Sequence, residues 1–129
     1  MPSPKGRILC TEDDTDTRDL LIFILRNEGY DVTCTDNTEQ TISLAKSQSF
    51  DLYLVDSWLP GGSGVTLTKE IREFDNKTAV LFYSAAAYES DKQRALKAGA
   101  QGYLVKPIEP EVLLAEVSRL IENSKIVYR

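Results

Sequence analysis

Short runs of apolar and β-branched residues alternate along the chain with longer stretches in which apolar residues recur every three or four positions. The short runs predict five strands, over residues 7–12, 32–35, 52–56, 79–83 and 102–105. Such an alternation is typical of a parallel sheet that has helices on both faces and right-handed crossovers. The sequence therefore predicts an α/β fold.

Five helices are expected between and after these strands. Three of them have an apolar stripe, formed by Leu20, Leu21, Ile24 and Leu25, by Leu67, Ile71 and Phe74, and by Leu113, Val117, Leu120 and Ile121. Weaker patterns cover residues 38–47 and 89–98. Gly29 and Gly99 follow predicted last turns, and Pro110 suits the first turn of the last helix.

The length of 129 residues leaves room for a single domain, whose core we expect over about residues 6–123. Twenty acidic residues against fifteen basic ones give a net charge of -5, and no run of Lys or Arg forms the basic stripe that a phosphate backbone requires. We therefore expect no direct binding to nucleic acid.

The absence of histidine excludes whole classes of site. A chain without histidine is not a Ser/His or Cys/His hydrolase, a His-ligated zinc enzyme or a histidine phosphocarrier. Cys10 and Cys34 each lie in an apolar stretch, and we expect buried, reduced thiols rather than a disulfide.

Polar residues stand at the ends of four predicted strands. Glu12 and Asp13 end the first, Asp56 ends the third, Ser84 follows the fourth and Lys106 follows the fifth. In parallel α/β sheets, ligands bind outside the carboxyl ends of the strands. These side chains are therefore expected to meet at one edge of the sheet.

Three of these residues are acids. Glu12, Asp13 and Asp56 would lie within a few ångströms of each other, and like charges that close raise one another's pKa unless a cation lies among them. Oxygen ligands without histidine or a nearby thiolate favour Mg²⁺ over zinc or copper, with Mn²⁺ as an alternative. Asp14 is better explained as a helix N-cap or a solvated loop residue.

A carboxylate at the end of an interior strand can also attack phosphorus and form an aspartyl phosphate, and Asp56 is the candidate. Phosphoryl transfer also needs a fixed cation and a hydroxyl or amide donor, which Lys106 and Ser84 would supply. Taken singly, Lys106 would be a surface lysine and Ser84 a turn residue. Their occurrence together with the acids favours a phosphoryl site.

Four segments in this order carry a resemblance to a known family. They are Ile8–Asp14, Asp51–Asp56 followed by Leu59-Pro60-Gly61, Ser84-Ala85, and Gly102–Pro107. Over nearly its whole length, the chain resembles the receiver domain of two-component response regulators, either the single-domain chemotaxis type or a receiver excised from a longer protein. The resemblance implies a flavodoxin-like, doubly wound parallel sheet of five strands in the order 2-1-3-4-5, with five helices.

The resemblance also implies a separate role for each acidic residue. Asp56 would be phosphorylated, and Asp13 would bind Mg²⁺ directly. Glu12 would act largely through water, and the backbone carbonyl of Trp58 would complete the protein ligands.

Other residues would read out the phosphorylated state. Lys106 would hold the phosphoryl group, Ser84 would swing to bond one of its oxygens, and Tyr103 would rotate inward behind it. This would change the face made by the fourth helix, the fifth strand and the fifth helix, which is the output face. An aromatic core residue is an equal alternative for Tyr103. The bond from Lys106 to Pro107 would be cis.

Some positions depart from the common family pattern. Glu12 stands where Asp is usual, which is expected to alter the affinity for metal, and Ser84 replaces the more frequent Thr, which loosens the switch. Residues 60–64 are unusually rich in glycine, so we expect a mobile loop.

In the family, the residues at Trp58 and Ala86 strongly influence how long the phosphoryl group survives. Neither side chain here can orient a water molecule, so we expect slow self-dephosphorylation. For Trp58, a partly exposed aromatic that contacts a partner is an equal alternative.

Two other functions compete with this interpretation. A phosphatase of the haloacid dehalogenase type also uses an aspartyl phosphate, and Asp14-Thr15-Asp16-Thr17 mimics its Asp-x-Asp motif, but the chain is short for that fold and its cap. A flavin- or dinucleotide-binding module is disfavoured because no glycine-rich phosphate loop follows the first strand.

The receiver interpretation predicts a signalling switch rather than an enzyme. Because the chain has no histidine, its donor would be a phosphohistidine on a separate histidine kinase or histidine phosphotransfer protein, and the output partner or domain stays open. Residues 1–6 lack the apolar core of a signal peptide, and no stretch of about eighteen apolar residues could span a bilayer. We expect a cytoplasmic protein without membrane insertion.

Overall fold

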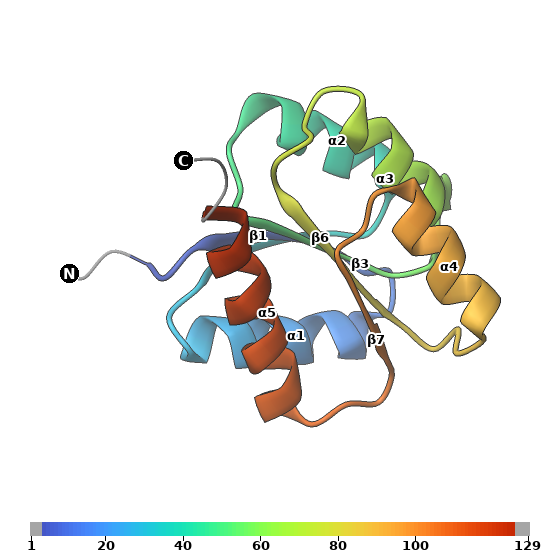
Figure 1. Ribbon diagram of the computed structural model, residues 1–129. Helices are drawn as coiled ribbons and strands as arrows, with labels where there is room; N and C mark the ends of the chain where they lie inside the picture. The colour runs from blue at the N-terminus through green and yellow to red at the C-terminus, as the bar shows by residue number, and fades with distance from the viewer. Residues whose placement is uncertain (1–3, 126–129) are drawn as a thin grey trace.

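In the computed structural model, which describes residues 4–125, five parallel strands form one sheet (Figure 1). The strands are β1 (Arg7–Thr11), β2 (Asp31–Thr35), β3 (Leu52–Val55), β6 (Ala79–Ser84) and β7 (Gly102–Val105). Their order is β2-β1-β3-β6-β7, which is the predicted 2-1-3-4-5 order of a flavodoxin-like sheet. The fold prediction is confirmed.

Helices cover both faces of this sheet (Figure 1). One face carries α1 (Thr15–Asn27) and α5 (Pro110–Lys125), and the other carries α2 (Thr38–Ser47), α3 (Gly64–Arg72) and α4 (Glu89–Ala98). The expected ends of α1 and α4 are confirmed, since Gly29 and Gly99 follow these helices with φ values of 108° and 119°.

Two apolar cores lie between the sheet and its two helical layers, one on each face. Alternate residues of each strand point to opposite faces, so Ile8 and Leu54 pack with α1 and α5, whereas Leu9 and Val55 pack with α2, α3 and α4. Every residue of β6 is buried. Because the interior strands are covered on both sides, their backbone is rigidly held, and this fixes the residues that follow their carboxyl ends.

The prediction was wrong for two residues, Leu20 and Phe74, which do not belong to the buried stripes of their helices. Leu20 lies on α1 but is 56% exposed, because Leu21 and Leu25 already fill the contact with the sheet. Phe74 lies beyond the end of α3, where the chain turns through hydrogen bonds from the amides of Phe74 and Asp75 to the carbonyl of Ile71.

A small antiparallel pair of strands was not predicted. β4 (Trp58–Leu59) pairs with β5 (Gly62–Ser63) directly after β3. Gly61, at the turn, has a φ of 89°, a conformation that glycine adopts without strain. The glycine-rich segment is therefore a hydrogen-bonded hairpin that leads into α3.

Within residues 4–125, no helix has both the length and the apolar character needed to cross a bilayer.

Candidate functional site

The predicted site residues converge at the carboxyl edge of the sheet. Glu12 and Asp13 directly follow β1, Asp56 follows β3, Ser84 ends β6 and Lys106 follows β7. These four strands are neighbours in the order β1-β3-β6-β7. The topology thus brings together residues that are up to 94 positions apart, the separation between Glu12 and Lys106.

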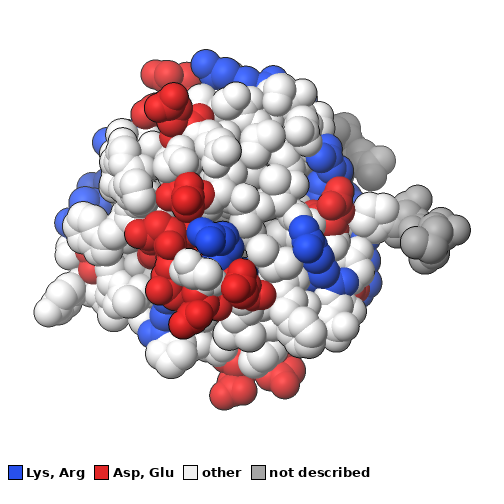
Figure 2. Space-filling model, turned by 180° about the vertical axis from the view of Figure 1, so that it is seen from behind, with Lys and Arg blue, Asp and Glu red and all other residues white. Residues whose placement is uncertain are grey.

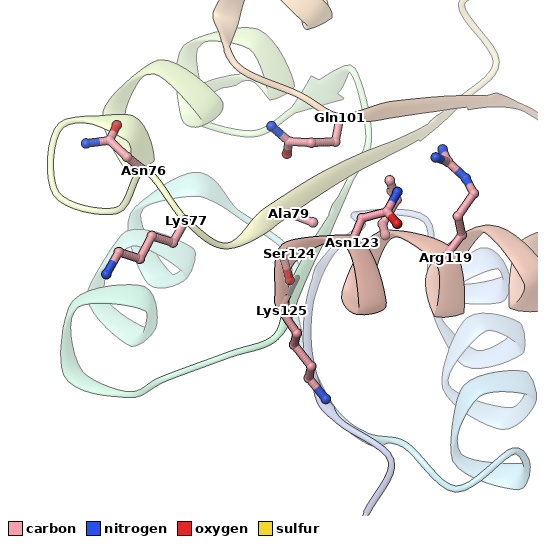
Figure 3. A pocket seen from close by; sticks show the side chains of 9 residues that line it. Asn76, Lys77, Ala79, Gln101, Arg119, Asn123, Ser124 and Lys125 are labelled. Carbon is pink, nitrogen blue, oxygen red and sulfur yellow. The ribbon is translucent and has the colours of Figure 1, made fainter. Parts of the chain in front are cut away.

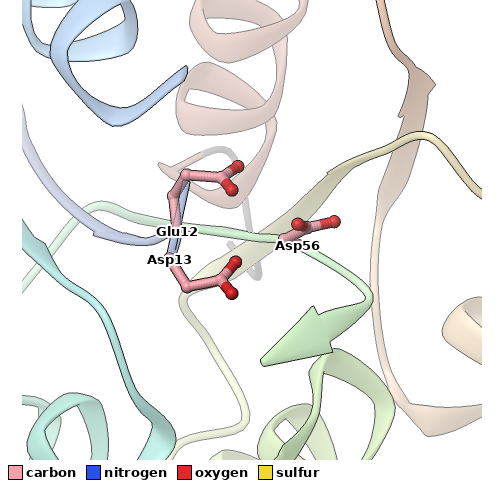
Figure 4. A group of neighbouring side chains, drawn as sticks. All are labelled: Glu12, Asp13 and Asp56. Carbon is pink, nitrogen blue, oxygen red and sulfur yellow. The ribbon is translucent and has the colours of Figure 1, made fainter. Parts of the chain in front are cut away.

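Three carboxylates form the centre of this edge (Figure 4). One oxygen from each of Glu12, Asp13 and Asp56 lies within 4.8 Å of the others. The side chain of Glu12 is only 2% exposed, whereas Asp13 faces solvent. Burial raises the pKa of Glu12, the charge of Asp56 adds to the rise, and the hydrogen bond from Lys106 opposes it. The crowded oxygen donors fit a hard divalent cation such as Mg²⁺.

Lys106 is the cation that the protein itself supplies. Its Nζ lies 2.9 Å from Oε1 of Glu12 and 3.4 Å from Oδ2 of Asp56. Burial works to lower the pKa of Lys106, but the hydrogen bond to Glu12 and the charge of Asp56 outweigh it and raise the pKa. Lys106 therefore stays charged beside Asp56.

The backbone around Asp56 is closely packed. Oδ1 of Asp56 accepts a hydrogen bond of 2.7 Å from the amide of Ser57. A Cβ atom at Gly64 would collide with the carbonyl oxygen of Asp56 and lie 2.8 Å from Cε2 of Phe82. Sequence reasoning noted the glycines of this segment but missed that Gly64 is needed for close approach to Asp56.

Ser84 and Tyr103 are joined through the backbone of Ala86. Ser84 is fully buried, and its Oγ accepts a hydrogen bond of 3.0 Å from the amide of Ala86. The hydroxyl of Tyr103 donates to the carbonyl of Ala86 at 2.6 Å, and its ring stacks on Phe82 with centroids 5.5 Å apart. The sequence drew attention only to the methyl group of Ala86, because nothing local signals these backbone contacts.

Trp58 and Pro107 flank the site. The Trp58 side chain is 71% exposed and lines a shallow groove with Asp91 and Arg94 of α4. The bond between Lys106 and Pro107 is cis, as expected.

Comparison with known proteins identifies the family. The sequence profile of the response regulator receiver domain matches residues 8–118. This chain belongs to the response regulator receiver domain family. Receiver domains are signalling switches of two-component systems.

Relatives agree with this assignment. The transcriptional regulatory protein AruR of Pseudomonas aeruginosa is 37% identical over 122 residues, which cover 91% of this chain and 50% of AruR. The chain spans about half the length of the curated relatives that it matches.

Solved structures agree as well. The CheY-like receiver domain protein of Methanospirillum hungatei JF-1 has a TM-score of 0.89 and 26% identity, covering 96% of this chain and 98% of that one. The receiver domain of sensor histidine kinase PA1611 from Pseudomonas aeruginosa PAO1 has a TM-score of 0.85 and 30% identity, covering 91% and 98%. That second structure has a magnesium ion coordinated in its active-site cleft.

The apparent phosphatase motif of this receiver domain has a structural explanation. Oδ2 of Asp14 accepts hydrogen bonds from the amide of Thr17 at 2.9 Å and from its hydroxyl at 2.7 Å. Asp14 is the N-cap of α1, as expected. The Asp-x-Asp pattern thus includes a helix cap, and the phosphatase alternative is not favoured.

Charge is unevenly distributed over the receiver domain. On the face shown in Figure 2, acidic side chains gather around a basic one, and the other basic side chains lie apart from this cluster. A cavity of about 520 Å³ lies at the amino ends of β6 and β7 and is lined by Lys77, Gln101 and Arg119, among other residues (Figure 3). This cavity is at the opposite edge of the sheet from Asp56.

Proposed function

We propose that Asp56 accepts a phosphoryl group from a phosphohistidine donor, with Mg²⁺ held at the same edge of the sheet. The observation that carries the proposal is the position of the Asp56 carboxylate, at the end of a central strand beside Glu12, Asp13 and the Nζ of Lys106. The family membership and the magnesium ion in the PA1611 receiver domain support it.

The residues divide the binding of the metal as follows. Asp13, the Asp56 carboxylate and the backbone carbonyl of Trp58 would hold Mg²⁺, and Glu12 would contact it through water. Mn²⁺, which takes similar oxygen ligands, is the alternative. The chemistry that the ion supplies is neutralisation of the carboxylates and of the phosphoryl oxygens.

The transfer step needs one oxygen of Asp56 as nucleophile. This oxygen attacks phosphorus, the bond between phosphorus and the donor imidazole nitrogen breaks, and the imidazole leaves with its electron pair and takes up a proton. Lys106 neutralises charge on the phosphoryl oxygens and positions the group. The 129 residues contain no histidine, so the phosphohistidine lies outside them, on a histidine kinase or a histidine phosphotransfer protein.

The phosphorylated state is read out through Ser84 and Tyr103. The Ser84 hydroxyl leaves the Ala86 amide and bonds a phosphoryl oxygen, while Tyr103 turns inward. The contacts of Ala86 with both side chains support this coupling. The affected surface is formed by α4, β7 and α5, and it controls an output partner or domain.

We assign residues 1–129 to a single receiver domain that acts as a switch in the cytoplasm. It takes part in its own phosphorylation and dephosphorylation rather than turning over an external substrate. Direct binding to nucleic acid is not part of this function, in keeping with the net charge of -5.

The test is phosphorylation by acetyl phosphate with Mg²⁺, followed by peptide mapping. We expect an acid-stable, base-labile acyl phosphate on Asp56 alone and complete loss of label in Asp56→Asn. Asp14→Asn is the matched control, because Asn also caps helices well and should leave labelling intact. Label on Asp14, or sustained turnover of a generic phosphomonoester, would favour the phosphatase instead.

A further inference from the structure

Cys10 and Cys34 lie side by side in the sheet. They are direct partners in the register of the parallel strands β1 and β2. Neighbouring strands are about 4.7–4.9 Å apart. This falls within the range of about 4.4–6.8 Å that separates the Cα atoms of disulfide-bonded cysteines. Paired residues on adjacent parallel strands point to the same face of the sheet, so both thiols face the core beneath α1 and α5.

The two cysteines differ in their surroundings. Cys10 is 1% exposed in the core beneath α1 and α5, whereas Cys34 is half-buried at the margin of that core. β2 is an edge strand of the sheet, so a small molecule in solution reaches Cys34 before Cys10.

The surroundings of Cys34 favour its reactive form. The pKa of the Cys34 thiol is lowered, mainly by the neighbouring thiol of Cys10, whose own pKa is raised, and the positive charges of Arg18 and Arg26 on α1 add to this against the effect of burial. Thiolates, rather than thiols, attack oxidants. The pair thus combines a partly exposed thiol on β2 with a second thiol at the paired position of β1.

We propose that Cys10 and Cys34 are an oxidisable dithiol that closes a cross-strand disulfide when the chain meets a hydroperoxide. Both cysteines are free in the structure, so this is the reduced form of the pair. The inference does not depend on phosphorylation of Asp56.

The chemistry takes two steps. The Cys34 thiolate attacks one oxygen of hydrogen peroxide and the O–O bond breaks, which leaves a sulfenic acid on Cys34 and releases hydroxide that becomes water. The Cys10 sulfur then attacks the Cys34 sulfur, the S–O bond breaks, and a second water leaves. Two electrons pass from the two sulfurs to the peroxide, and a thiol reductant reverses the change.

The experiment treats the reduced chain with hydrogen peroxide, removes the excess, and blocks free thiols with N-ethylmaleimide in denaturant before intact-mass analysis. We expect a monomer that has lost two hydrogen atoms and takes up no maleimide. After reduction it should take up two. Asp56→Asn should behave in the same way, which separates this inference from the phosphoacceptor proposal.

Two variants assign the roles. In Cys10→Ser, the sulfenic acid of Cys34 should persist and be trapped by dimedone, because the second sulfur is gone. In Cys34→Ser, buried Cys10 should remain a free thiol under the same treatment. In the unmodified chain, two free thiols after peroxide, overoxidation without a disulfide, or a disulfide only between two chains would each overturn the proposal.

Discussion

The two ends of the sheet shift the pKa of a carboxyl group in opposite directions. At the amino end, Asp75 accepts hydrogen bonds from the hydroxyls of Tyr53 at 2.9 Å and Thr78 at 2.6 Å, and from the amides of Lys77 and Thr78 at 3.0 Å each. Burial works to raise the pKa of Asp75, but these bonds outweigh it and the pKa lies below its ordinary value. At the carboxyl end, the pKa of Glu12 is raised.

The difference separates a structural acid from a binding site. The fold supplies four donors to a single carboxylate at Asp75, so its charge is balanced within the domain. At the carboxyl end, oxygens of Glu12, Asp13 and Asp56 lie within 4.8 Å of one another, and Lys106 pairs with Glu12 and Asp56. The second arrangement leaves negative charge that an external cation can balance, which is the physical basis of the proposed Mg²⁺ site.

The largest effect is expected from Asp75→Ala. This change leaves the buried Tyr53 hydroxyl without its acceptor and should lower the free energy of unfolding by about 3 kcal/mol at neutral pH. Urea unfolding measures it, with Asp13→Ala as the control, which should cost little without Mg²⁺. An equal loss in both variants would contradict the distinction between the two ends.

The contribution of Asp75 should also depend on pH. Because the pKa of Asp75 is lowered in the folded state, its stabilisation is present above the ordinary aspartate pKa of about 3.9 and is lost as the pH falls through the folded value. The difference between the unmodified chain and Asp75→Ala should therefore shrink in acid. A difference that grows as the pH falls would contradict this.

The next effect concerns the lifetime of the phosphoryl group. Neither Trp58 nor Ala86 offers a group that orients water, so the double variant Trp58→Asn, Ala86→Glu should speed acyl-phosphate decay by about a hundredfold with Mg²⁺ present. The rate is followed by loss of label from Asp56. If the unmodified chain decays as fast as the variant, the metal, Ser84 and Lys106 alone set the rate.

Gly64→Ala should distort the carboxyl end of the sheet. Its new Cβ would collide with the carbonyl of Asp56, so we expect about 2 kcal/mol of destabilisation and slower labelling of the folded protein. Gly6→Ala is the matched control at the amino end of β1, where a Cβ would lie 3.3 Å from Oδ2 of Asp51 and would meet no backbone atom at closer range. Similar losses in both variants would show that Gly64 has no special relation to the site.

The smallest effect is stabilisation by Mg²⁺. Binding to the native state alone adds about 1.4 kcal/mol at ten times the Kd, and Asp13→Asn should weaken it. Thermal unfolding of a metal-free preparation, with and without Mg²⁺, measures the change. Equal melting temperatures in the unmodified chain would rule the site out.

The sequence alone predicted the positions of most helices and strands and the edge of the sheet that carries the site. Strand periodicity and the glycines after α1 and α4 located most elements, and the topology rule placed Glu12, Asp13, Asp56 and Lys106 at one edge. The contacts of Gly64 with Asp56 and of Tyr103 with Ala86 were missed, because they depend on how segments distant in sequence pack. The exposure of Leu20 was missed because periodicity does not tell which side of a wide stripe faces the sheet.

The most direct measurement is transfer from a phosphohistidine-bearing phosphotransfer protein to this chain, with and without a metal chelator. We predict that transfer to Asp56 requires Mg²⁺, falls sharply in Asp13→Asn, and persists in folded Asp75→Asn. Transfer that is unaffected by the chelator and by Asp13→Asn, or that depends on Asp75 as strongly as on Asp13, would contradict the assignment of the carboxyl end as the metal-dependent phosphoacceptor site.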